Sequence, residues 1–216
     1  MGYGNSSESK LPTTFFKIEG LKQGSTDIYF KGKTKEGDKY VEISEKPNRI
    51  YGHLTEFGIK EFEWENETHK IVRVVLDSDK DRVILEGGFS NVMINLINTV
   101  AGNKEAIDKL SLSVYISKKG YASLGVEIDG KDWKENSWKF NYAEDLKPLI
   151  EEVKNKKGKI TGYDKTDLID FLVKEIESED FQGKIKGNPP SPTVVVESPV
   201  VTEEVTMGDD DSDLPF

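Results

Sequence analysis

Aromatic and basic side chains alternate through residues 115–142, a stretch that reads YISKKGYASLGVEIDGKDWKENSWKFNY. Aromatic rings stack on nucleobases and lysines contact phosphates, and each stacked base contributes about 1–3 kcal/mol to the binding of a single strand. The stretch therefore predicts nucleic-acid contacts from Lys118, Lys119, Tyr121, Lys131, Trp133, Lys134, Trp138 and Lys139. In the competing interpretation some of these rings, such as Trp138, point inward and fill a core.

A second group of candidates lies earlier in the chain. Arg49, Tyr51 and His53 share one face of an expected strand, because side chains alternate across a strand with period two. Arg73 lies on the strand expected over Thr68–Asp77. A face that is cationic, polar and aromatic suits an open binding surface, although an ordinary solvated strand face has the same composition.

The last eight residues, DDDSDLPF, combine an acidic run with an apolar end. A terminal Phe offers a rigid aromatic anchor beside its own carboxylate, and the proline before it lowers the entropy lost on binding. Aspartates steer such a motif toward basic surfaces. We predict that this tip binds partner proteins through Asp209, Asp210, Asp211, Asp213, Leu214, Pro215 and Phe216.

The ending resembles the acidic tip of bacterial and phage single-stranded DNA-binding proteins, with Ser212 as the one interruption of the pattern. The resemblance covers the tip and the linker before it, and it indicates a divergent, possibly phage-encoded, member of the family. It implies an OB-type barrel that binds single-stranded DNA. It also implies that the tip docks onto helicases, primases, polymerases, nucleases or recombination mediators and competes with DNA for the groove.

Hydrophobic periodicity predicts a mainly β chain with added helices (α+β). Alternating patterns between turn signals predict strands over Thr13–Glu19, Thr26–Lys31, Lys39–Ser44, Arg49–Ile59, Thr68–Asp77, Asp81–Glu86, Leu110–Ser117 and Tyr121–Ile128, with a last short strand over Trp138–Tyr142. Ser90–Ala101 has a helical apolar face behind the capping residue Ser90. Two further helices are expected over Asp145–Lys156 and Thr166–Glu179.

A helix between the third and fourth strands is the usual OB arrangement, and here it requires extra strands before the barrel. We expect a disordered segment over 1–11, an OB-like domain with two C-terminal helices over 12–186, a flexible linker over 187–208 and the partner-binding tip over 209–216. The proline-rich, acidic linker contains no basic residue and cannot assemble a core of its own.

Charge and composition narrow the functional class. The net charge is −10, but residues 187–216 hold seven acids, so residues 1–186 carry a net charge of only −3. The chain has no cysteine, which excludes disulfides and thiolate chemistry. We find no P-loop, nucleophile elbow, metal-ligand spacing or apolar run of membrane length, and we expect neither an enzyme nor a cofactor.

These observations favour a cytoplasmic protein (in the host cytoplasm if phage-encoded) that protects single-stranded DNA in replication, recombination and repair. Two alternatives stay open. One is an adaptor that uses the tip without touching DNA, and the other is a phage annealing or recombination mediator. A homo-oligomer is possible with any of them.

Overall fold

The computed structural model describes residues 11–22, 24–36, 38–132 and 138–185. The predictions for the N-terminal segment up to residue 10, for the linker and tip over 187–216, and for Trp133 and Lys134 therefore lie outside the described residues.

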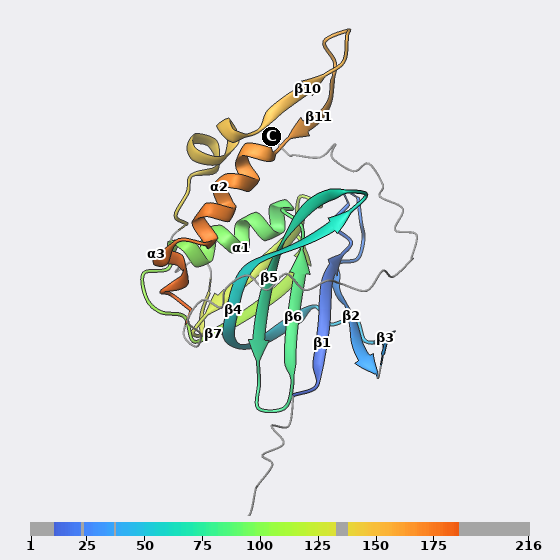
Figure 1. Ribbon diagram of the computed structural model, residues 1–216, viewed down its shortest axis with the longest axis vertical. Coiled ribbons are helices and arrows are strands. Elements are labelled where there is room, and N and C mark those ends of the chain that lie inside the picture. Colours follow the sequence, from blue (N-terminus) through green and yellow to red (C-terminus); the bar gives the residue numbers. More distant parts are fainter. Residues whose placement is uncertain (1–10, 23, 37, 133–137, 186–216) are drawn as a thin grey trace, which may run out of the picture.

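A single nine-stranded sheet dominates the molecule, in the order β3-β2-β1-β6-β5-β4-β7-β8-β9 (Figure 1). All neighbouring strands are antiparallel except β1 and β6, which are parallel. The strands are β1 (Thr13–Glu19), β2 (Tyr29–Glu36), β3 (Lys39–Glu42), β4 (Arg49–Trp64), β5 (Glu67–Asp77), β6 (Arg82–Gly87), β7 (Lys109–Ile116), β8 (Ala122–Ile128) and β9 (Lys131–Asp132).

Strand β4 joins the two halves of the sheet. Its first five residues pair with β7, and from His53 onward it pairs with β5. The register shifts between Leu54 and Glu56, and such a bulge bends a strand and increases its twist. At Gly52 a Cβ would lie 2.9 Å from the carbonyl oxygen of Asp77, so this close approach requires glycine.

Strand β2 lies close to β4 and β7 although it is not their neighbour in the sheet order. The Phe30 N–H donates a 2.8 Å hydrogen bond to the Pro47 carbonyl, and the Val114 N–H donates one of the same length to the Asn48 carbonyl. The sheet is therefore strongly curled, but the order runs from β3 to β9, so the ladder of the described strands is open. The prediction of a mainly β chain with added helices is confirmed.

Helix α1 (Asn91–Gly102) confirms the expected helix. The Ser90 side chain caps it by accepting a hydrogen bond from the Met93 N–H at 3.4 Å. Leu96 and Ile97 are fully buried, so the helix supplies one wall of the hydrophobic core.

The C-terminal helices pack on that same core. Helix α2 (Thr166–Ile176) lies where a helix is expected, and α3 (Glu179–Gln182) follows as a separate turn capped by Ser178. Asp164 Oδ1 accepts hydrogen bonds from the Thr166 N–H and hydroxyl just before the helix begins, whereas Lys165 at the N-cap position makes no side-chain cap hydrogen bond. The buried side chains of this segment join the core cluster: Leu168, Leu172, Val173, Ile176, Phe181 and Ile185.

The predicted helix over Asp145–Lys156 is wrong. A π-helical turn (Tyr142–Leu146) and a 3₁₀ turn (Lys147–Leu149) come first, and strands β10 (Glu151–Lys154) and β11 (Ile160–Asp164) then form a separate hairpin. Pro148 cannot continue a helix from its interior, and Asn155 with Gly158 forms a turn instead. The short strand predicted over Trp138–Tyr142 is also wrong, because Asn141 caps the π-helical turn there.

Candidate nucleic-acid interface

The outer face of β4, β7 and β8 carries the first candidate surface. On β4, Arg49 pairs with Ser113 of β7, Tyr51 with Ser111 and His53 with Lys109. Ser113 and Ser111 pair in turn with Gly125 and Glu127 of β8. Tyr115, two residues beyond Ser113 along β7, pairs with Ser123. We call this surface the β4–β7–β8 face, defined by Arg49, Tyr51, His53, Lys109, Ser111, Ser113, Tyr115, Ser123, Gly125 and Glu127.

Two tyrosines stand on this face with small residues between them. Tyr51 is 69% exposed and Tyr115 is 45% exposed. Tyr115 lies four residues beyond the partner of Tyr51 on β7, a separation of about 13 Å along the strand at about 3.3 Å per residue. A Cβ at Gly125 would meet the Tyr115 ring at 3.6 Å. The face therefore forms a shallow shelf bounded by two exposed rings on rigid strands.

Charged groups surround the shelf, and several are already paired. Arg49 Nε donates to Ser111 Oγ at 2.7 Å, and its Nη2 lies 3.1 Å from Glu127 Oε2. His53 Nδ1 lies 3.0 Å from Asp108 Oδ1. A pocket of about 350 Å³ opens beside these side chains and is also lined by Asp77, Asp79 and Lys109. The surface is mixed in charge rather than uniformly basic.

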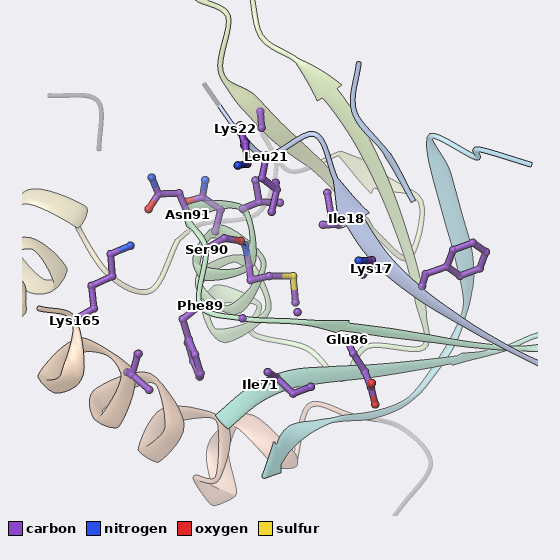
Figure 2. A pocket seen from close by; sticks show the side chains of 18 of the residues that line it. Lys17, Ile18, Leu21, Lys22, Ile71, Glu86, Phe89, Ser90, Asn91 and Lys165 are labelled. Atoms are coloured by element: carbon purple, nitrogen blue, oxygen red, sulfur yellow. The ribbon is translucent and has the colours of Figure 1, made fainter. Parts of the chain in front are cut away.

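A larger groove of about 1500 Å³ is lined by Ala122 and Ser123 at the start of β8 and by residues of β1, β2, α1 and β11. Figure 2 shows the start of α1 (Ser90 and Asn91) at its centre, with Lys17 of β1 on one flank and Lys165 near α2 on the other. Ring-bearing side chains in its lining come from five segments of the chain: Phe15 with Phe16, Phe89, Tyr121, Tyr142 and Tyr163. Burial raises the pKa of the Tyr142 phenol, and the nearby Tyr163 adds a smaller effect in the same direction. Tyr142 therefore stays neutral at physiological pH.

The lysines of β1 and β2 in this groove have local partners. Lys17 Nζ lies 2.8 Å from Glu19, and Lys31 Nζ lies 2.8 Å from Glu42. The hydrogen bond to Glu42 raises the pKa of Lys31. Lys33 Nζ lies 4.7 Å from the centre of the Tyr40 ring. These pairs are exposed, and such pairs hold side chains weakly, so phosphates can compete for the lysines.

The predicted residues of the β7–β8 turn lie at the mouth of this groove. Lys118 and Lys119 are exposed at the tip of the turn, and Tyr121 lines the groove. Hydrogen bonds from the Ser117 N–H to the Tyr121 carbonyl and from the Gly120 N–H to the Ser117 carbonyl hold the turn. The structure therefore places Arg49, Tyr51 and His53 at the pocket and Tyr121 at the groove, so the predicted contacts fall on two surfaces.

Two predicted cations are neutralised by neighbours from distant parts of the chain. Arg73 Nε lies 3.2 Å from Glu56 Oε1, and its Nη1 lies 3.2 Å from Glu86 Oε1, so two carboxylates offset its positive charge. Lys139 lies 2.7 Å from Glu175. Burial opposes the charged form of Lys139, but Glu175 and Asp180 outweigh it and raise the pKa of the lysine. We therefore leave Arg73 and Lys139 out of the interface.

Trp138 and Lys131 are exposed but join neither surface. Trp138 is 48% exposed and precedes Lys139, whose N–H donates to the Asn98 carbonyl at 3.4 Å. Lys131 lies on β9, opposite Ile128. Neither side chain lines the pocket or the groove.

Sequence reasoning missed part of the β4–β7–β8 face. Tyr115 lay within the aromatic stretch but was not singled out, and Lys109, Ser111, Ser113 and Gly125 were not considered. The signal was present, since period two over Lys109–Ile116 places Ser111, Ser113 and Tyr115 on one side and the buried Leu110, Leu112 and Val114 on the other.

No protein-family model, no curated protein and no solved structure matches this chain. The assignment of function therefore depends on the site itself. In the part of the chain that the structure describes, no cluster of His, Asp or Glu could hold a metal ion. A search of those same residues finds no helix with the length and apolar character needed to cross a membrane.

Proposed function

We propose that this protein binds single-stranded DNA on the β4–β7–β8 face and in the adjoining groove. One observation carries the proposal: Tyr51 and Tyr115 stand exposed on rigid strands beside a floor of serine and glycine. Exposed rings on an ordered sheet contribute little to the core, and proteins that bind single strands stack bases on such rings. Arg49 and Lys109 flank the rings and supply positive charge for phosphates.

The order of elements supports an OB-type barrel within the larger sheet. From β4 onward the chain runs through three strands, α1 and two more strands, and β4 is long, bulged and paired with both β5 and β7. In OB-folds, oligonucleotides bind on the face of the second and third strands and at the loops after the first and fourth. With β4 counted first, these two strands are β5 and β6, whose Ile71 and Glu86 line the groove. With β4 counted first, the fourth loop is the β7–β8 turn that carries Lys118 and Lys119.

The second half of the proposal concerns the acidic tip. Asp209–Phe216 would bind replication or repair enzymes while the folded domain holds DNA, which is a binding role without catalysis in the cytoplasm. The motif supports this because a run of aspartates followed by Leu-Pro-Phe presents negative charge and an aromatic anchor together.

A titration with oligo-dT and with duplex DNA of equal length tests the proposed function, with tryptophan fluorescence and a gel shift as readouts. We expect saturable binding of oligo-dT, much weaker binding of duplex, and an affinity that falls steeply with salt because bound counterions are released. Absence of oligo-dT binding at low salt would overturn the proposal and leave the adaptor role of the tip.

Deletion of Asp209–Phe216 is expected to leave the affinity for oligo-dT equal or higher. The deletion removes four aspartates from a chain with a net charge of −10 and so weakens its repulsion of phosphate. The affinity of full-length and truncated protein for the same oligonucleotide at the same salt checks this. A clear loss of affinity on truncation would contradict it and would make the tip part of the DNA site.

A further inference from the structure

The β10–β11 hairpin projects away from the body of the molecule beyond α2 (Figure 1). Every residue of β10 is exposed, and so are all residues of the connecting turn over 155–159. That turn reads NKKGK and presents Lys156, Lys157 and Lys159 to solvent. A two-stranded hairpin gains little stability on its own, so this extension is not explained by core packing.

The turn has a defined conformation. Asn155 Oδ1 accepts hydrogen bonds from the Lys157 N–H at 2.9 Å and the Lys159 N–H at 3.1 Å. The Asn155 N–H donates to the Lys159 carbonyl at 2.9 Å, and Gly158 takes the positive φ of 77° that the turn needs. The lysines are therefore presented from an ordered backbone, which lowers the entropy lost when they bind a ligand.

The three lysines of the turn lack acidic partners. Within the described residues, the ion pair nearest the turn joins Lys154 to Glu152 at 2.8 Å, and Lys156, Lys157 and Lys159 pair with no carboxylate. This distinguishes them from Lys17, Lys31 and Lys139, each of which has a carboxylate within 3 Å. A cluster of three uncompensated positive charges favours a polyanionic ligand.

The base of the hairpin opens onto the large groove. Val153 of β10 and Tyr163 of β11 line it, together with Tyr142 and with Lys165 at the start of α2. From Tyr163 to Lys159 the chain advances about 13 Å at about 3.3 Å per residue. Rings at the base and lysines at the tip repeat the pairing of stacking and phosphate contacts that single strands require.

We propose that the β10–β11 hairpin is a lysine arm that holds the phosphates of a DNA single strand passing through the groove, as a contact separate from the β4–β7–β8 face. This inference rests on the proposed function. Because each lysine–phosphate contact on a single strand releases counterions, three contacts change the slope of log affinity against log salt by about 2.

The test compares two triple variants in a salt titration of affinity for a 30-nucleotide oligo-dT. The arm variant is Lys156→Ala/Lys157→Ala/Lys159→Ala. The control variant, Lys80→Ala/Lys104→Ala/Lys174→Ala, removes the same charge from exposed lysines that line neither the groove nor the pocket. We expect the arm variant to bind more weakly with a slope shallower by about 2, and the control to keep the wild-type slope.

Each other outcome has a distinct meaning. If wild-type protein binds and both variants keep its slope, the arm does not contact DNA, and the proposed function stands without it. If the arm variant keeps the DNA slope but loses binding of a polyglutamate peptide, the arm is a site for acidic protein segments. If wild-type protein binds no oligo-dT, the proposed function and the arm fail together.

Discussion

Replacing Tyr51 and Tyr115 together with alanine is expected to weaken binding to a short oligo-dT by at least about 30-fold at fixed salt. Each stacked base contributes about 1–3 kcal/mol, so two rings supply at least about 2 kcal/mol. Both rings are exposed, so the domain loses little packing when they are removed. The affinity is measured by titration, and a thermal melt of each variant verifies the fold.

The salt dependence of the double variant separates stacking from electrostatics. The substitution removes no charge, so the slope against salt is expected to stay at the wild-type value while the affinity falls. Trp138→Ala is the matched control, because Trp138 is 48% exposed and lines neither the pocket nor the groove. Equal affinities for the double variant and wild type would remove the β4–β7–β8 face from the interface.

The regular elements with strong local signals were predictable from the sequence. Strand β1 matches its predicted range, and β5 and β7 match theirs to within a residue. In β7 the apolar residues Leu110, Leu112 and Val114 are buried at every second position, because one face of the strand packs on the core. Helix α1 was predictable from Ser90, whose hydroxyl does accept from Met93, and from its 3.6-residue apolar period.

The hairpin after residue 150 was not predictable in the same way. Leu149, Ile150 and Val153 have helical spacing, but the structure leaves Val153 about half exposed in a strand. Two local features, Pro148 and the Asn155 turn, oppose the helix more strongly than the periodicity favours it. A short apolar run does not distinguish helix from strand, so the turn residues carried the better signal.

The placement of the candidate residues was predictable only in part. Tyr51 and Arg49 were identified because alternation places them on one face, and the structure puts them there beside Ser111. Ion pairs between residues far apart in the sequence could not be predicted, since no local pattern shows that Glu175 lies 2.7 Å from Lys139. Period two along β7 groups Tyr115 with Ser111 and Ser113, but only the register of β4 on β7 shows that Tyr115 shares a face with Tyr51.

Phe181→Ala is expected to lower the free energy of unfolding by about 3–5 kcal/mol, the usual cost of deleting a fully buried phenylalanine side chain. Phe181 is fully buried, and its ring meets Phe57 of β4 edge to face with 5.1 Å between ring centres. Urea unfolding followed by circular dichroism measures the loss as a lower midpoint with an unchanged m-value.

The size of that loss shows whether α3 is a necessary part of the core or an appendage to it. Next to Phe181, Gln182 Nε2 donates to the Phe57 carbonyl at 3.0 Å, and the Ile107 N–H donates to the Lys184 carbonyl at 2.6 Å. Phe62→Ala is the control, because Phe62 is only partly buried and stacks on His69 at the surface of the sheet, so its removal leaves a smaller cavity. Equal, small losses for both variants would mean that α3 is an appendage free to serve as an oligomer interface. A several-fold larger loss for Phe181→Ala would mean that the nine-stranded sheet depends for its stability on the core packing of the segment over residues 179–185.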